Sequence, residues 1–292
     1  GEGSEGNDGP RSASAPSGST STTAKLPGDV LDLAEWYLTL PTGKAGDPDT
    51  VEQPALGKLT NEFFKVDGSG DGIVFSARGD GVTTKNSHFP RSELREMNGS
   101  EKAAWSSTSG THTLDVCEAI TKVPSAKPEV VGAQIHDDKD DVLQIRLEGQ
   151  KLMVQYDDGK SEQPLDENYQ LGTPYNVRII AADSKVEVLY NGQKKAELPL
   201  SGSGWYWKVG AYVQSNSGTG DASGSGAVTV YALNVDHNNN DATSAGSVGA
   251  SASGAPAEKG SEDQAGNKVD EKKTGDKVDQ KDQSADAVGA GY

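Results

Sequence analysis

The chain has 292 residues, of which 44 are acidic and 27 basic, so that its net charge is −17. A chain this acidic is poorly suited to nonspecific nucleic-acid binding, which needs a basic surface, and its sequence has no apolar run long enough to span a bilayer. We therefore expect neither a nucleic acid nor a membrane as partner. Cys117 is the single cysteine, which excludes an intramolecular disulfide, and its β-patterned neighbours predict a small buried side chain.

The two ends of the chain differ in composition from its middle. Residues 1–26 are mostly glycine, serine, threonine and proline, and residues 238–292 run from an Asn/Gly/Ser/Ala stretch into a tail rich in charged residues and glutamine. Such segments bury too little apolar surface to offset chain entropy, so we predict that both are disordered. The sequence thus predicts one folded domain over residues 27–237. Because that domain is acidic too, binding of a polyanion would require a local cluster of cations.

Within the domain, short runs rich in β-branched and aromatic residues alternate with Gly, Asp and Asn turns. Asn191-Gly192 is the strongest hairpin signal and predicts a type I′ turn. Only Asp29–Ala34 suggests a helix. The expected fold is therefore all-β, a sandwich or barrel. The clearest strand runs are Ile73–Ala77, Val142–Leu147, Leu152–Tyr156, Tyr175–Ala181, Val186–Tyr190 and Val228–Val235.

Three further segments read as strands with one polar and one apolar face: residues 91–95 (RSELR), 134–136 (QIH) and 206–214 (YWKVGAYVQ). Residues two apart in a strand share a face, which leaves Leu94, Ile135, Trp207 and Val209 on the apolar reverse. The polar faces together carry cations, hydrogen-bonding groups and proton-transfer groups, as a groove for an anionic polymer would. They present Arg91, Glu93, Arg95, Gln134, His136, Tyr206, Lys208, Tyr212 and Gln214.

Two of these residues admit alternative interpretations. Glu93 lies between Arg91 and Arg95, which favours a salt-bridge partner that fixes their geometry. Hydrolysis of a glycosidic bond normally needs two carboxylates, and Glu93 and Glu96 fall on opposite strand faces, which argues against that chemistry. Tyr206 is equally compatible with a sugar-contacting platform and with a structural hydroxyl.

The sequence does not predict a metal site. Residues 67–72 begin like a calcium-binding loop, but Arg78 stands at the twelfth position, where a bidentate glutamate is required. We interpret the segment as a turn. Residues 137–141 contain four aspartates beside His136, and we expect a solvated loop there rather than a cation site.

The three ordered segments resemble the signature regions of the alginate lyases of polysaccharide lyase family 7, whose usual patterns are R-(S/T)-E-L-R, Q-(I/V)-H and Y-F-K-A-G-x-Y-x-Q. The departures are Trp207 for Phe and Val209 for Ala, both on the predicted apolar face. Residues 36–43 also resemble the first strand of that family. The resemblance spans roughly residues 35–236 and implies a β-jelly-roll sandwich with a concave, substrate-binding groove.

The resemblance further implies β-elimination of 1,4-linked uronates in alginate, an anionic polysaccharide. We expect an endo-acting enzyme, because an open groove suits internal cleavage, and no cofactor, because this chemistry needs none. The family residues matching Arg91, Gln134 and His136 surround the sugar carboxylate, and the one matching Tyr212 transfers protons. The remaining face residues, Glu93, Arg95, Tyr206, Lys208 and Gln214, would bind substrate. A free tyrosine is a weak base unless cations lower its pKa, and we expect Arg95 and Lys208 to do so for Tyr212.

Several alternatives stay open at the level of sequence. Tyr212 acts as base and then acid on mannuronate, or His136 takes the proton while Tyr212 protonates the leaving oxygen on guluronate. A lyase for another polyuronate, such as glucuronan, would use the same residues. A carbohydrate-binding jelly roll without turnover would keep the groove but would not need Tyr212. We expect the protein to be secreted, from its substrate class, and to be a monomer.

Overall fold

The computed structural model describes residues 25–219 and 221–239, so the predicted disordered tails lie almost entirely outside the described residues. The predicted domain limits at 27 and 237 stay a prediction. The elements, in chain order, are α2 Pro27–Val30, β1 Trp36–Lys44, β2 Asp47–Val51, η1 Ala55–Lys58, β3 Phe64–Val66, β4 Ile73–Arg78, β5 Arg91–Asn98, β6 Glu101–Lys102, β7 Thr111–Lys122, β8 Glu129–His136, β9 Asp141–Glu148, β10 Lys151–Tyr156, β11 Ser161–Asp166, β12 Tyr175–Ala182, β13 Lys185–Tyr190, β14 Gln193–Leu198, β15 Tyr206–Val213, η2 Ser217–Thr219 and β16 Ser225–Asn238.

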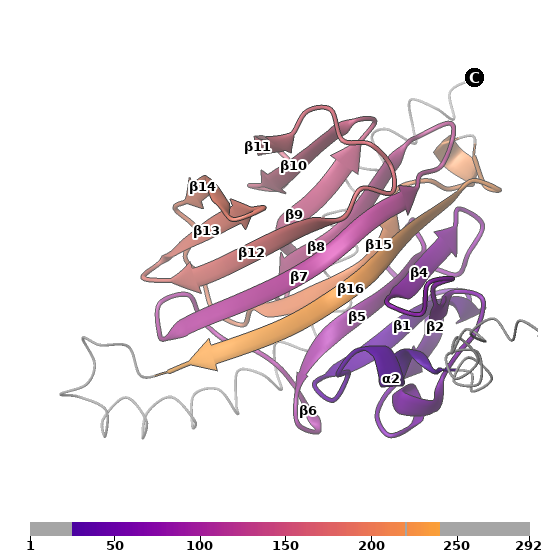
Figure 1. The fold of residues 1–292 in the computed structure, drawn as a ribbon, viewed down its shortest axis with the longest axis horizontal. Helices are drawn as coiled ribbons and strands as arrows, with labels where there is room; N and C mark the ends of the chain where they lie inside the picture. The colour runs from indigo at the N-terminus through magenta and orange to yellow at the C-terminus, as the bar shows by residue number, and fades with distance from the viewer. Residues whose placement is uncertain (1–24, 220, 240–292) are drawn as a thin grey trace, which may run out of the picture.

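These strands form two antiparallel sheets that pack face to face (Figure 1). The nine-stranded sheet has the order β11-β10-β9-β8-β15-β5-β1-β2, with β6 paired to β5. The seven-stranded sheet has the order β14-β13-β12-β7-β16-β4-β3. The prediction of an all-β jelly-roll sandwich is therefore confirmed. In the described part of the chain, no helix is long and apolar enough to cross a membrane.

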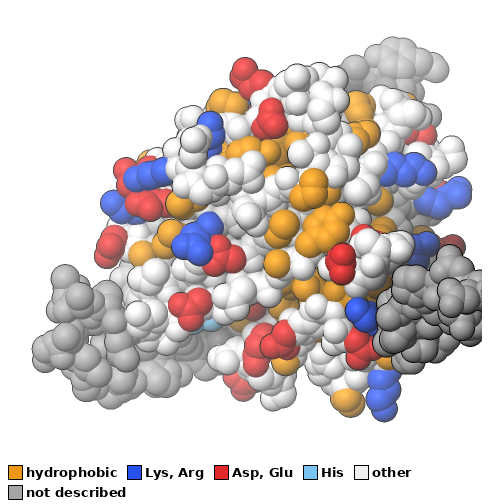
Figure 2. Space-filling model, viewed as in Figure 1, with side chains coloured by type: hydrophobic (Ala, Val, Ile, Leu, Met, Phe, Trp, Pro, Cys, Tyr) orange, Lys and Arg blue, Asp and Glu red, His pale blue; other side chains and the backbone are white. Residues whose placement is uncertain are grey.

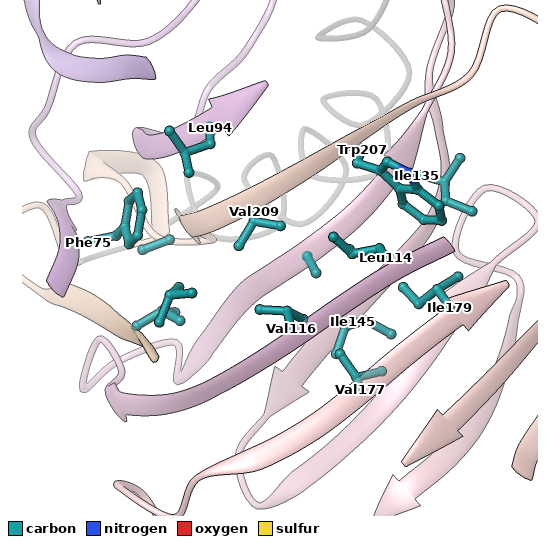
Figure 3. Close-up of a cluster of buried hydrophobic side chains, with 14 of the residues drawn as sticks. Phe75, Leu94, Leu114, Val116, Ile135, Ile145, Val177, Ile179, Trp207 and Val209 are labelled. Atoms are coloured by element: carbon teal, nitrogen blue, oxygen red, sulfur yellow. The ribbon is translucent and has the colours of Figure 1, made fainter. Parts of the chain in front are cut away.

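The space between the sheets is filled by apolar side chains from both of them (Figure 3). Leu94, Ile135 and Trp207 enter it from the nine-stranded sheet, and Leu114 and Ile179 enter it from the other. All five are fully buried. The apolar faces of β5, β8 and β15 thus form one side of the core. Because these faces are buried, the polar side chains of the same strands point to the opposite face of the sheet.

The local predictions were mostly confirmed. Asn191 and Gly192 both have positive φ, 49° and 83°, between the paired strands β13 and β14, as a type I′ turn requires. The helix prediction was wrong in its limits, because α2 ends at Val30. Cys117 was also predicted wrongly: it is half-buried, since the alternation of β7 turns Val116 and Glu118 inward and Cys117 outward.

The outer face of the seven-stranded sheet, shown in Figure 2, carries no concentration of one charge sign. Lysine and arginine side chains are interspersed with aspartate and glutamate, and apolar side chains lie between them over the middle of the sheet. Arg178 pairs with Asp115, and Lys194 pairs with Glu187, across neighbouring strands. Such exposed pairs contribute little to stability. This face is a solvated outer surface.

A chain of hydrogen bonds connects the two sheets at one end of the sandwich. The carboxylate of Glu96 on β5 lies 2.6 Å from Nε2 of His237 on β16, and Nδ1 of His237 lies 2.7 Å from Nδ1 of His112 on β7. The other oxygen of Glu96 accepts a hydrogen bond from the indole N–H of Trp105, whose ring stacks on His112. We call these four residues the Glu96–His237 clasp. It ties the end of β16 to the opposite sheet.

Candidate active site

The three signature segments lie on adjacent strands, β8, β15 and β5, in the middle of the nine-stranded sheet. Tyr206 pairs with His136, and Lys208 lies between Gln134 on one side and Arg95 on the other. Tyr212 pairs with Arg91 on β5. The strand register therefore brings together the predicted site residues, which are far apart in sequence. They are between 0% and 9% exposed, so a substrate must gain access to them as it binds.

Gly210 has no side chain, so the polar row on β15 has a gap between Lys208 and Tyr212. Its φ is 155°, and a Cβ at this position would lie 2.4 Å from the carbonyl oxygen of Ser92 on β5. Only glycine fits a backbone this close to its neighbour. The glycine in the signature segment is therefore a requirement of strand packing at the site.

Glu93 is the hub of the polar face. Its carboxylate accepts hydrogen bonds from Arg91 at 2.9 Å and from the amide of Gln134 at 2.8 Å, and Lys208 lies at 2.9 Å. Burial alone would favour protonation of Glu93, but the charges of Lys208 and Arg91 hold its pKa below the usual value. Glu93 thus remains ionised and fixes the positions of Arg91, Gln134 and Lys208.

Arg95 contacts the backbone and Tyr206, and its predicted partnership with Glu93 stays a prediction. The guanidinium of Arg95 donates hydrogen bonds to the carbonyl oxygens of Glu96 and Ala103, at 2.9 and 3.0 Å, and lies 3.5 Å from the ring centre of Tyr206. Lys208 also lies on the carboxylate of Glu93. The sequence analysis named only the two arginines as partners of Glu93 and missed the lysine that the neighbouring strand contributes.

Arg91 is a cation beside Tyr212 that the sequence analysis did not name for this role. The guanidinium of Arg91 lies 3.9 Å from the centre of the Tyr212 ring, whereas Arg95 lies over Tyr206. A nearby positive charge favours the ionised form of a phenol. Arg91 is thus a further cation beside Tyr212, and the expected effect of Arg95 and Lys208 on the pKa of Tyr212 stays a prediction.

His136 is held in a defined tautomer. Its Nδ1 lies 2.8 Å from the carbonyl oxygen of Asp137, and because a carbonyl only accepts, Nδ1 carries the proton of the neutral ring. Burial, with the positive charge of Lys208, keeps the pKa of His136 well below the ordinary histidine value. The ring is therefore neutral at neutral pH, and its Nε2 has a lone pair that can accept a proton.

Tyr206 contacts His136 and the backbone next to it. Its hydroxyl lies 3.1 Å from Nδ1 of His136 and 3.3 Å from the carbonyl oxygen of Asp137, and its ring stacks on the imidazole. Tyr206 is only 4% exposed. Of the two interpretations that the sequence left open, these contacts favour the structural hydroxyl.

Gln214 lies at the other end of the face, in a second polar cluster. Its amide oxygen accepts a hydrogen bond from Arg146 on β9 at 3.0 Å, and the same guanidinium nitrogen donates to Gln144. Arg146 is also paired with Glu129 and Glu148. Sequence analysis missed Gln144, although its alternation with Arg146 on β9 was a usable signal. Ser87 was missed as well; its hydroxyl lies 3.2 Å from that of Tyr212.

The acidic segment after His136 is less solvated than expected. Asp140 is 5% exposed, and oxygens of Asp140, Asp141 and Asp158 lie within 4.8 Å of one another. Burial and the neighbouring carboxyl groups raise the pKa of Asp140 to about 11, so that it holds a proton. The expectation of a solvated loop was therefore wrong for Asp140. The prediction that the protein has no metal site remains a prediction.

Residues 31–237 match the family described as Alginate lyase. Among solved structures, alginate lyase AlgAT5 from polysaccharide lyase family 7 is 46% identical, with a TM-score of 0.70, and the match covers 73% of this chain and 99% of that one. The alginate lyase from Corynebacterium sp. is 41% identical, with a TM-score of 0.71, over 74% of this chain and 99% of that one. A curated alginate lyase from Klebsiella pneumoniae is 38% identical over 76 residues, which make up 24% of each protein.

The fold and these matches first define a class: the chain is a polysaccharide lyase built on an antiparallel jelly-roll sandwich. More particularly, the chain belongs to the alginate lyases of polysaccharide lyase family 7, because the family match spans more than half of its length. The predicted family and enzyme class are thereby confirmed. The matched segment spans about a quarter of the Klebsiella enzyme.

Proposed function

We propose that this protein cleaves alginate internally by β-elimination and releases unsaturated oligosaccharides. Family membership supports alginate as the substrate, since the similar proteins are named alginate lyases. The observation that carries the mechanism is the neutral His136, with its Nε2 lone pair, on the same face as the cations Arg91 and Lys208.

The proposed reaction removes the C5 proton of a uronate and expels the oxygen at C4. The C5 proton is weakly acidic while the adjacent carboxylate keeps its charge, and Arg91 and Gln134 would neutralise that charge as the enolate-like intermediate forms. Groups aimed at developing charge are among the largest catalytic contributions, and losing one typically costs about 3–4 kcal/mol. Glu93 supports this step by holding both side chains in place.

The low pKa of His136 supports it as the base on guluronate, where Tyr212 would protonate the leaving oxygen. A base must be unprotonated to act. Because burial, together with the charge of Lys208, lowers the pKa of His136, the ring stays unprotonated even at pH values below the usual histidine pKa. On this proposal, activity on guluronate-rich blocks persists to a pH below about 6.5 before protonation of His136 abolishes it. On mannuronate, Tyr212 would act both as base and as acid.

Ultraviolet absorbance on separate guluronate-rich and mannuronate-rich blocks tests the reaction, since elimination leaves a conjugated C4=C5 double bond that hydrolysis does not. We expect a rising signal together with a rapid fall in viscosity, which marks internal cleavage. A flat trace on both blocks from folded protein, with a rise on glucuronan, would show that another polyuronate is the substrate.

Tyr212→Phe tests the proton-transfer role. We expect the rate to fall at least about a hundredfold, within the range typical of general acid–base groups, while alginate binding is largely retained. Tyr190→Phe removes a phenolic hydroxyl from β13 in the other sheet and should leave the rate unchanged. A near-normal rate for Tyr212→Phe would remove Tyr212 from the mechanism.

We further propose that the protein is a secreted monomer. A polymeric substrate supports secretion, because it must be cut before it can enter a cell. Light scattering after gel filtration tests the monomer. The proportion of activity in the medium of the source culture tests secretion.

A further inference from the structure

The segment that precedes β5 packs over Tyr212. Phe89 and Val131 form with Tyr212 a small apolar cluster that is separate from the main core. Beside it, Oγ of Ser87 lies 3.2 Å from the hydroxyl oxygen of Tyr212. Ser87 is 5% exposed and Tyr212 is 1% exposed, so water is largely excluded from this contact. A hydrogen bond in such surroundings is stronger than one at the surface.

The remaining bonds of Ser87 restrict what its hydroxyl does. Oγ lies 3.1 Å from the backbone N–H of Phe89, which only donates, and 3.1 Å from the carbonyl oxygen of Phe89, which only accepts. A serine hydroxyl has one proton to donate and two lone pairs. When that proton is directed to the Phe89 carbonyl, Oγ accepts the O–H of Tyr212. When it turns toward Tyr212, it donates to a phenolate.

We propose that Ser87 is a positioning residue that follows the proton of Tyr212, accepting a hydrogen bond from the phenol and donating one to the phenolate. The proposal rests on the proton-transfer role of Tyr212 proposed above and extends it to a residue outside the signature segments. The balance is simple: Tyr212 gains or loses one proton to the sugar, and the proton of Ser87 stays on Oγ and only changes direction.

Other groups near this contact act on Tyr212 as well. Arg91 lies over its ring and is itself paired with Glu93. Since Arg91 already favours the phenolate, loss of Ser87 shifts the titration of Tyr212 without abolishing it. The other charged or titratable groups around the contact are Lys127, which lies over the ring of Phe89, His88, next in the chain to Ser87, and Lys208 and His136 further along the face.

The test is Ser87→Ala, measured as pH profiles of kcat and of KM on alginate by ultraviolet absorbance. The bond that Ser87 donates to the phenolate is charge-assisted and therefore stronger than the one it accepts from the phenol, so the loss of both raises the pKa of Tyr212. We expect one limb of the profile to move to higher pH by roughly one unit, with kcat lower by about tenfold and KM little changed. The direction is the same whether Tyr212 acts as base, on the acid limb, or as acid, on the alkaline limb.

Two variants separate this role from a structural one. Ser87→Thr keeps a hydroxyl and should restore the profile; should it fail to fold, Ser87→Cys, a weaker hydrogen-bonding group, should give an intermediate shift. Ser107→Ala is the matched control, because Ser107 is a fully buried serine that bonds the backbone of Leu200 and Gly202 away from the site. It should leave both limbs in place.

Unchanged limbs in Ser87→Ala, with Tyr212→Phe inactive, would overturn the role of Ser87 and leave that of Tyr212 intact. A loss of kcat with no shift, not restored by Ser87→Thr, would overturn it too, because that pattern reflects structure alone. Normal turnover by Tyr212→Phe would instead remove the proposed function of Tyr212, and the role of Ser87 with it.

Discussion

Glu93 and Glu118 are both fully buried, and their surroundings are opposite. Glu93 lies on the polar face of the nine-stranded sheet, with bonds to Arg91, Gln134 and Lys208. Glu118 lies on β7 among the apolar side chains between the sheets, and neither of its oxygens has a hydrogen-bond partner among the described residues. The hydroxyl of Tyr175 lies near Glu118 but outside normal hydrogen-bond geometry, and it lowers the pKa of this carboxyl less than burial raises it.

The difference shows that partners, more than burial, decide the charge of a carboxyl group. Burial raises the pKa of Glu118 well above the usual value, so that it is protonated at neutral pH. Burial acts on Glu93 in the same direction, but two cations outweigh it, and the pKa of Glu93 is lowered. One carboxyl is therefore an ion that organises the active site, and the other is a neutral group in the core.

Glu93→Gln should have the largest effect on both stability and activity. The substitution keeps the shape but removes the charge that Arg91 and Lys208 pair with, and breaking a buried ion pair typically destabilises by about 3–5 kcal/mol. Activity should fall about a hundredfold or more, since three site residues lose their anchor. Urea unfolding and the ultraviolet assay measure the two effects.

The deficit of Glu93→Gln should itself depend on pH. The folded pKa of Glu93 is lowered, so its contribution to stability is present above the unfolded pKa, near 4.5, and is lost as pH falls. Glu197→Gln, at an exposed ion pair, is the control and should change little. A Glu93→Gln protein as stable and active as wild type would mean that Glu93 is not the organising ion.

Glu118→Gln should have the opposite pH dependence. The folded pKa of Glu118 is raised, so its contribution is fully present below the unfolded pKa of about 4.5 and is lost as pH rises toward the folded pKa. Relative to wild type, the variant should gain up to about 1.4 kcal/mol for each pH unit within that window. Unfolding free energies at several pH values measure the slope. A difference that stays flat between pH 5 and 8 would contradict a protonated Glu118.

Gly132→Ala should show the smallest effect, one confined to packing. A Cβ at Gly132 on β8 would lie 2.4 Å from an oxygen of Glu118 in the opposite sheet. Overpacking of this kind destabilises by about 1–3 kcal/mol. A double-mutant cycle with Glu118→Ala, followed by thermal unfolding, should recover part of that loss because it makes room for the methyl group. Additive effects would place the strain of Gly132→Ala elsewhere.

Much of the fold and of the site face was predictable from sequence. Strand alternation placed Arg91, His136 and Tyr212 on one face, because a buried reverse fixes the register of each strand. Glu118 could have been noticed by the same rule, since it falls on the core face of β7 with Leu114 and Val116. A charged residue in that pattern was a signal that sequence analysis passed over.

The contacts within the face were less predictable. Which cations reach Glu93 depends on how the strands pair and on the conformation of each long side chain. The alternation of polar and apolar residues gives information on neither. The contact between Ser87 and Tyr212 joins residues 125 positions apart through an irregular segment, which has no periodicity to read. Sequence patterns therefore predicted which residues share the face, and the structure was needed to show which of them touch.

The Glu96–His237 clasp has a mechanical consequence. β16 lies between β7 and β4 and is hydrogen-bonded to both. The clasp joins His237, near the end of β16, to Glu96 on β5 in the opposite sheet. A pull along the chain at Asn238 would load the hydrogen bonds of β16 in parallel, as shear, rather than opening them one after another. The clasp would share that load at His237, the residue next to Asn238 in the strand. The point where the chain leaves the domain is thus reinforced against tension.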